Sequence, residues 1–229
     1  MKILLLLLGI FPFAGVNASY SDLQLNTDDR PPFEYLDSEG VLRGVAAELI
    51  TCSLDKLDVK YEINVVPWSR AQKSVEAGLA DGFFAASQNL ERDKYARLSA
   101  TIVDQNWSWY LSKDLTLSPN SEEFKNHVKV SSWIGSNSLK WLEENKYNLK
   151  QPSKHNRELV KRLLGGRING VYASNIVFEA ALNDLGESLD NLKVVKDQYR
   201  PMGVYFSESY LEKNPGFIED FNVAAKKCK

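Results

Sequence analysis

The chain has 229 residues, of which 44% are hydrophobic and 25% charged, and its formal net charge is −2 at pH 7. This mild acidity argues against a nucleic-acid partner, because nucleic-acid-binding proteins usually carry clustered positive charge. After residue 18 no segment approaches the roughly 20 consecutive apolar residues of a transmembrane helix, so we expect a soluble mature protein.

The first residues have the pattern of a signal peptide. Lys2 precedes a leucine-rich apolar run, and Val16 and Ala18 place small side chains at the spacing that signal peptidase requires. We therefore predict a signal peptide over residues 1–18, a mature chain that begins at Ser19, and export to the periplasm.

The first half of the mature chain predicts strands alternating with helices. Alternating apolar and polar residues indicate strands, spacing of three or four indicates helices, and proline, glycine and aspartate indicate loops. In chain order the segments are a strand at 22–27, a loop at 28–44, a helix at 45–57, a strand at 59–66, a helix at 67–80 and a strand at 81–87.

The same alternation begins again in the second half. It predicts a strand at 107–114, strand, turn and helix at 127–145, a helix at 153–168, strand and helix at 169–185, strands at 191–198 and 201–208, and a helix at 214–229. Such alternation is typical of α/β proteins with mainly parallel sheets covered by helices. Two similar units in one chain predict two lobes with a cleft between them.

Cysteine and histidine are scarce in this chain. In an oxidising compartment Cys52 and Cys228, the only two cysteines, predict one disulfide, although two unrelated thiols are the alternative. His127 and His155 do not have metal-ligand spacing, so we expect no metal site. We also expect no cofactor, because the sequence has no phosphate-binding glycine loop.

Two segments of the first half carry a pattern of proline, glycine and acidic residues. "PPFEYLDSEGVLRGVAAEL" (31–49) contains Pro-Phe-x-Tyr and two spaced glycines, and "PWSRAQKSVEAGLADGFFAASQNLERDKYARLS" (67–99) contains Asp-Gly, then a serine and an arginine. Together they resemble the bacterial extracellular solute-binding proteins of family 3, the amino-acid-binding type of periplasmic binding protein. The second half of the chain matches in outline only.

The resemblance implies a two-lobed α/β fold of the second topological type, in which each lobe is a mainly parallel sheet flanked by helices. Lobe 1 would comprise residues 19–110 and 197–229, and lobe 2 residues 111–196. Both cysteines would then lie on lobe 1. In such proteins the ligand binds between the lobes and closes them by a hinge motion.

The resemblance also implies roles for Arg92 and Ser87. In the family the corresponding arginine holds the ligand's α-carboxylate with both arms of its guanidinium, and the hydroxyl contacts the same group. A helix predicted to begin near Asn89 would add free amides to this anion site. The alternative is that Arg92 pairs with Glu91 or Asp93 on an exposed helical turn.

Ser174 departs from the family pattern. It stands in "RINGVYASN" (167–175) where amino-acid binders place the aspartate that pairs with the ligand's ammonium group. A buried ammonium group without a counter-charge costs several kcal/mol. Either an acidic residue of the first loop, Asp28, Asp29 or Glu34, supplies the charge, or the ligand is not an ordinary α-amino acid.

Five further residues are candidates for the ligand site. Trp68 could stack on the ligand or belong to the core, and Arg70 could add a second cation or face solvent. Arg30 lies in the first loop, where the family often has an aromatic residue. Ser136 and Asn137 could offer polar groups to the ligand or cap the helix that they begin.

The leading hypothesis is a periplasmic binding protein, not an enzyme. As a monomer it would capture a small carboxylate-bearing solute, an amino acid or related organic acid, for an inner-membrane ABC permease or a sensor. One alternative is an enzyme similar to cyclohexadienyl dehydratases, with Glu34 or Glu179 as its acid-base group. Another is a sensory or interaction module that binds no ligand.

Overall fold

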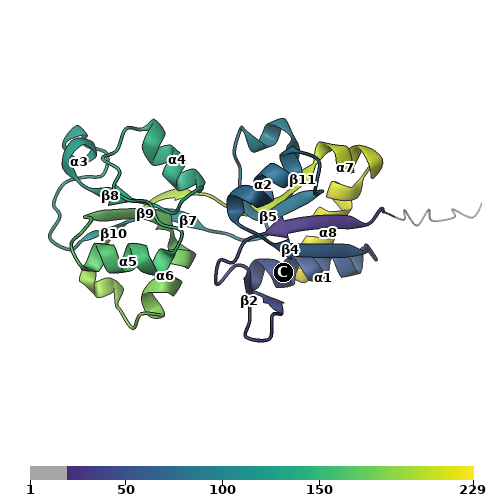
Figure 1. The fold of residues 1–229 in the computed structure, drawn as a ribbon, viewed down its shortest axis with the longest axis horizontal. Coiled ribbons are helices and arrows are strands. Elements are labelled where there is room, and N and C mark those ends of the chain that lie inside the picture. Colours follow the sequence, from purple (N-terminus) through teal and green to yellow (C-terminus); the bar gives the residue numbers. More distant parts are fainter. Residues whose placement is uncertain (1–19) are drawn as a thin grey trace, which may run out of the picture.

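The computed structural model describes residues 20–229, so the predicted signal peptide and the start at Ser19 lie outside the described part. Two larger β-sheets lie side by side along the long axis of the molecule, each flanked by its own helices (Figure 1). Within residues 20–229 no helix combines the length and the apolar character needed to cross a bilayer.

The first sheet holds five strands drawn from both ends of the chain. Their order is β4 (Tyr61–Val65), β1 (Leu23–Thr27), β5 (Gly82–Ser87), β11 (Met202–Ser207) and β6 (Ala96–Leu98). Helices α1 (Val45–Lys56), α2 (Trp68–Glu76), α7 (Glu208–Lys213) and α8 (Phe217–Cys228) pack around it. A two-stranded ribbon, β2 (Tyr35–Leu36) with β3 (Leu42–Arg43), interrupts the segment predicted as a loop.

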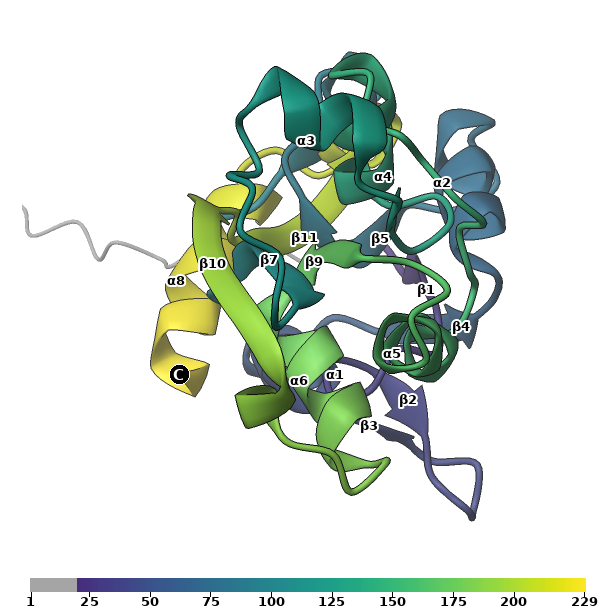
Figure 2. The ribbon, with the colours of Figure 1, turned by 90° about the vertical axis from the view of Figure 1, so that its left-hand side faces the viewer.

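The second sheet holds four strands from the middle of the chain. Their order is β10 (Leu192–Tyr199), β7 (Asn106–Ser112), β9 (Gly170–Ser174) and β8 (Val130–Ser131). Helices α3 (Glu122–His127) and α4 (Asn137–Glu144) pack on one face, and α5 (Asn156–Leu164) and α6 (Asn175–Asn183) pack on the other (Figure 2).

Both sheets are mixed, which corrects the expectation of mainly parallel sheets. In the first, β1 runs parallel to β4 and β5, but β11 runs antiparallel to β5 and β6. In the second, β7 runs antiparallel to β9 and β10, and only β8 and β9 are parallel. The chain enters the second sheet through β7 and goes back to the first sheet through β10 and β11. Because the entering and returning strands run in opposite directions, each sheet contains antiparallel pairs.

Two crossings join the sheets, one between Leu98 and Asn106 and the other between Tyr199 and Met202. By sheet membership, all of β7 and β10 belong to the second unit. The boundaries expected at 110 and 197 fall inside β7 and β10, which pair with each other along their length.

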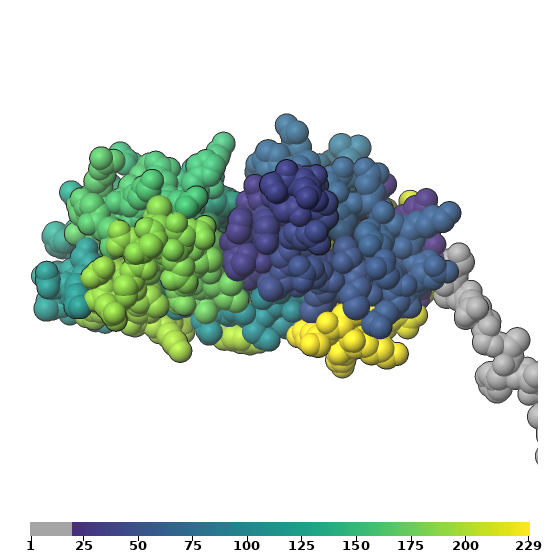
Figure 3. All heavy atoms as spheres, turned by 90° about the horizontal axis from the view of Figure 1, so that it is seen from below, coloured from purple at the N-terminus to yellow at the C-terminus, as the bar shows by residue number. Residues whose placement is uncertain are grey.

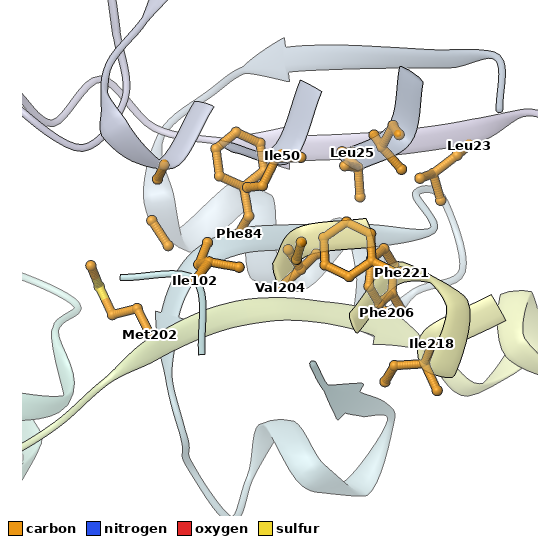
Figure 4. Packing of buried hydrophobic residues seen from close by; sticks show 14 of the residues in the cluster. Leu23, Leu25, Ile50, Phe84, Ile102, Met202, Val204, Phe206, Ile218 and Phe221 are labelled. Carbon is orange, nitrogen blue, oxygen red and sulfur yellow. The ribbon is translucent and has the colours of Figure 1, made fainter. Parts of the chain in front are cut away.

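Strand alternation gives each sheet two buried faces. Phe83 and Phe84 are neighbours in β5 and point to opposite sides: Phe84 packs with the cluster under α1 and α8, and Phe83 with the cluster under α2. Figure 4 shows Phe84 near Ile50, Ile102 and Val204 in the first of these clusters. Each sheet therefore has a core of its own, which is what two lobes require.

The predicted disulfide is present between Cys52 and Cys228. Cys52 lies in α1 and Cys228 is the last residue of α8, and these two helices pack against each other beside the first sheet (Figure 1). The alternative of two unrelated thiols is wrong. The bond ties the end of the chain to a helix near its beginning.

Candidate ligand-binding site

A pocket lies between the two sheets. Part of this pocket is open to solvent, and side chains from both sheets line it. In Figure 3 the two bodies meet along a seam, where the purple and blue first part of the chain touches the green second body. Seven of the predicted site residues line this pocket: Arg30, Trp68, Ser87, Arg92, Ser136, Asn137 and Ser174.

Strand ends and helix starts bring these side chains together. Ser87 is the last residue of β5 and Ser174 the last of β9, so the carboxyl ends of one strand from each sheet face the pocket. Trp68 begins α2 directly after Pro67, and Asn137 begins α4. Residues far apart in the sequence therefore meet at one place.

Arg92 is buried, with 4% of its surface exposed, and none of the acidic residues within 20–229 forms an ion pair with it. Its Nε donates to Gln72 Oε1 at 2.9 Å and its Nη1 to the carbonyl of Ser87 at 2.9 Å. The guanidinium also lies 5.3 Å from the ring centre of Trp68. Burial lowers the pKa of Arg92 to about 10, and no carboxylate among residues 20–229 offsets this cost with an ion pair.

Two predictions for the segment around Arg92 are not observed in the structure. Arg92 does not pair with Glu91, which instead binds Lys94, nor with Asp93, which accepts a hydrogen bond from Tyr205. The helix predicted near Asn89 is also wrong, because only a three-residue 3-10 turn forms at Arg92–Lys94. Such a turn has no helix dipole to offer, so the anion site depends on the guanidinium itself.

Arg30 forms a second cationic group at the pocket, but this cation is compensated. Its Nη2 lies 2.9 Å from Glu34 Oε1 and 3.7 Å from Asp28 Oδ1. Nη2 also donates to the carbonyl of Ala85 at 2.8 Å. Ala85 has φ of 55° in the left-handed region, where β5 and β11 change register, so a bulge presents this carbonyl to Arg30.

Asp28 and Glu34 are buried behind Arg30 and do not line the pocket. Neither oxygen of Asp28 has a hydrogen-bond donor, and neither has Glu34 Oε2. Burial raises the pKa of both carboxyls, that of Glu34 well above its ordinary value, although Arg30 opposes the shift. The prediction that Asp28 contacts the ligand is therefore not supported by its position, and Asp29 is exposed.

A pH dependence of stability follows from Glu34. Its pKa is raised on folding, so the folded chain binds the proton more tightly than the unfolded chain. The corresponding stability is present below the unfolded pKa and is lost as pH rises through the folded pKa. Glu34→Gln keeps the Oε1 acceptor and adds a donor for Asp28, so we expect it to be about 1–3 kcal/mol more stable than wild type at pH 8.

Urea unfolding at several pH values between 5 and 8 measures this difference. The gap between Glu34→Gln and wild type should widen as pH rises. Glu39→Gln, which makes the same charge change at an exposed residue, should show no such widening. A constant gap across this pH range would contradict the assignment of a proton-binding role to Glu34.

Asn137 connects the second unit to the first, and Ser136 begins the same helix. Asn137 Nδ2 donates to Ser87 Oγ at 2.9 Å, and Asn89 Nδ2 donates to Asn137 Oδ1 at 2.6 Å. Ser136 caps α4 by accepting from the amide of Leu139, as its alternative interpretation predicted. The contacts of Asn137 join the two sides of the pocket.

Ser174 and Arg70 complete the set of predicted residues. Ser174 precedes α6 but does not cap it, and its buried Oγ has no hydrogen-bond partner among residues 20–229. Arg70 is exposed and lies outside the pocket, so the solvent-facing interpretation of this residue is the one observed.

Sequence reasoning missed Trp107 and Trp133, which form two walls of the pocket. Trp133 lies 5.5 Å from Arg30, measured from ring centre to guanidinium carbon, and Trp107 lies 4.9 Å from Arg200. Trp107 is the second residue of β7, and Trp133 lies two residues after the last residue of β8. Both tryptophans stand next to an end of a predicted strand, and this position could have identified them as pocket residues.

The model of the bacterial extracellular solute-binding proteins, family 3, matches residues 23–222. The chain belongs to this family. A search of curated proteins found no match to this family 3 protein.

Solved structures share the fold of this family 3 protein at low identity. An arginine-bound Gly52Ala mutant of ArgBP from T. maritima is 17% identical, with a TM-score of 0.71 over 91% of this chain and 96% of that chain. A crystallised ancestral amino-acid-binding protein, a precursor of cyclohexadienyl dehydratase, is 21% identical (TM-score 0.72; 90% and 88%). A histidine kinase sensor domain with similarity to periplasmic binding proteins is 15% identical (TM-score 0.76; 91% and 90%).

Proposed function

We propose that this protein captures a small carboxylate-bearing solute between two lobes in the periplasm. It then delivers the solute to an ABC permease or reports it to a sensor. The observation that carries the proposal is Arg92, a buried cation on the pocket wall with hydrogen bonds to neutral groups only. A carboxylate would supply the missing counter-charge through paired, charge-assisted hydrogen bonds.

The two crossings between the sheets support a hinge. Each is short, and the sheets on either side have separate cores. Movement at residues 99–105 and 200–201 would open the pocket while leaving both cores packed. The contacts of Asn137 with Ser87 and Asn89 would break on opening, and a ligand that touches both sides would favour closure.

Binding is better supported than catalysis at this pocket. Neither carboxyl considered for acid-base chemistry reaches the pocket wall: Glu34 is held by Arg30, and Glu179 accepts a hydrogen bond from Tyr110 at 2.9 Å. A general acid must lie within hydrogen-bond reach of its substrate. Binding proteins bound to amino acids and a sensor domain both occur among the structural neighbours, so delivery and sensing both remain within the proposal.

Thermal unfolding of residues 19–229 with a panel of amino acids, 2-oxo acids, dicarboxylates and aromatic acids tests the proposal. A ligand at 100 times its Kd adds about 2.7 kcal/mol, which raises the Tm of a chain of this size by roughly 5–10 °C. The methyl esters of the same compounds lack the carboxylate and should not raise Tm. Equal shifts with acid and ester, or no shift with any acid, would contradict a carboxylate site.

A further inference from the structure

The charged groups on the pocket wall are all cationic. Arg30 and Arg92 line the pocket, and among residues 20–229 neither an aspartate nor a glutamate does. A zwitterionic ligand would bring its carboxylate to Arg92, but its ammonium group would then face a wall without any negative charge. An ammonium group removed from water and left unpaired is strongly unfavourable.

The two carboxyls of Glu34 and Asp28 lie against Arg30 and do not line the pocket. Glu34 is fully buried, and its Oε1 accepts hydrogen bonds from Nε and Nη2 of Arg30 at 3.2 and 2.9 Å. Asp28 is 4% exposed and lies on the same guanidinium. Because the two carboxyls already compensate Arg30, they do not form a free anionic contact for a ligand.

The aromatic walls do not replace the missing carboxylate. A cation can be held by the face of a tryptophan ring, but arginines already lie over these rings. Arg30 lies 5.3 Å from the ring centre of Trp68 and 5.5 Å from that of Trp133, and Arg92 also lies over Trp68. Another cation placed against these rings would be repelled by the guanidinium groups.

Ser174 offers an uncharged polar contact on the opposite side from Arg92. Ser174 lines the pocket, and its buried Oγ has neither a donor nor an acceptor as partner among residues 20–229. A hydroxyl can donate to an oxygen or accept from one. An oxygen substituent on the ligand would satisfy this group, which is unfavourable when it stays buried without a hydrogen bond.

We propose that the ligand is an organic acid without an ammonium group, a 2-hydroxy or 2-oxo acid rather than an α-amino acid. Its carboxylate binds Arg92, and its neutral oxygen substituent faces Ser174. The inference rests on the proposed function, because it names the ligand class of the same pocket. The tryptophan walls suit a flat or apolar remainder of the molecule.

Calorimetric titration of the full mature chain with matched compounds tests this ligand class. Each set shares one carbon skeleton and differs only at the 2-position: phenylalanine, 3-phenyllactate and phenylpyruvate in the first set, and glutamate, 2-hydroxyglutarate and 2-oxoglutarate in the second. In a set that binds, the hydroxy or oxo acid should bind at least about tenfold more tightly than the amino acid, because only the amino acid strands a charge.

A variant at Ser174 makes the test reciprocal. Ser174→Asp places a carboxylate on the wall, so the ratio of affinities should move toward the amino acid by about tenfold or more. Ser174→Asn is the matched neutral change and should affect both ligands together without moving their ratio. Melting curves establish whether each variant folds. If Ser174→Asp does not fold, the ratio of affinities measured on wild type still decides the ligand class.

The failures of the two proposals are distinguishable. If an amino acid binds wild type as tightly as its oxo and hydroxy counterparts, and Arg92→Ala abolishes that binding, the ligand class is overturned while the carboxylate site stands. If neither matched set nor any other acid of the wider panel binds, both proposals are overturned.

Discussion

Arg92→Ala is expected to abolish binding of the carboxylate-bearing solute, lowering its affinity by about 100-fold or more. Truncating one partner of a buried, hydrogen-bonded charge pair costs about 2–5 kcal/mol or more, and 1.4 kcal/mol corresponds to a factor of ten. Of the two arginines that line the pocket, Arg92 is the one without an ion pair among residues 20–229, so the loss of affinity should be largest for its removal. Calorimetric titration with any acid found to stabilise the protein measures the loss.

Two further variants separate charge from geometry. Arg92→Lys keeps a positive charge but loses the planar pair of donors, so it should restore only part of the affinity. Arg70→Ala removes an arginine that is exposed and outside the pocket, so it should bind like wild type.

Unfolding without ligand distinguishes a binding role of Arg92 from a structural one. Burial lowers the pKa of Arg92 to about 10, which means that the folded chain bears a cost for keeping this cation charged. We therefore expect Arg92→Ala without ligand to lose little stability. A loss of several kcal/mol combined with unchanged ligand affinity would identify Arg92 as a structural residue.

The double variant Cys52→Ala/Cys228→Ala is expected to lose about 2–5 kcal/mol of stability. The disulfide joins residues separated by 176 positions, and in the chain-entropy account a crosslink over so long a loop restricts the unfolded chain strongly. It also holds α8 against α1, so the end of the chain should fray first in the variant. Urea unfolding of the oxidised wild type and the variant measures the difference.

Reduced wild-type protein provides the matched control, because it has the same missing bond but native side chains. It should unfold at nearly the same urea concentration as the double variant. Neither cysteine lines the pocket, so ligand affinity of the folded variant should stay close to that of wild type. Identical unfolding of oxidised and reduced protein would contradict a stabilising role for the bond.

Much of the candidate site could be anticipated from residue patterns. Trp68, Ser87 and Arg92 lie in a segment with a family motif, and each reaches the pocket because it stands at the end of a strand, the start of a helix or the turn between them. Ser174 could be identified as a site residue because it stands where the family pattern has an aspartate. These positions were predictable because strand ends and helix starts are local features.

Other parts of the site could not be anticipated because they depend on burial. Asp28 and Arg30 were both ligand candidates, but Arg30 lines the pocket and covers Asp28. The bulge at Ala85, which presents a carbonyl to Arg30, arises from the pairing of β5 with β11. The residues of these two strands are more than a hundred positions apart, so spacing within one segment does not reveal the bulge.

Residue patterns were enough to predict the alternation of strands and helices, the family, the paired cysteines and the place of Arg92 after a buried strand. These signals are local periodicity and short motifs, which act over a few residues. The folded chain was needed to show that the sheets are mixed, that Trp107 and Trp133 close the pocket, and that no acidic side chain among residues 20–229 lines it. Strand direction and the charge of a pocket depend on which distant segments pack together, and local patterns do not contain that information.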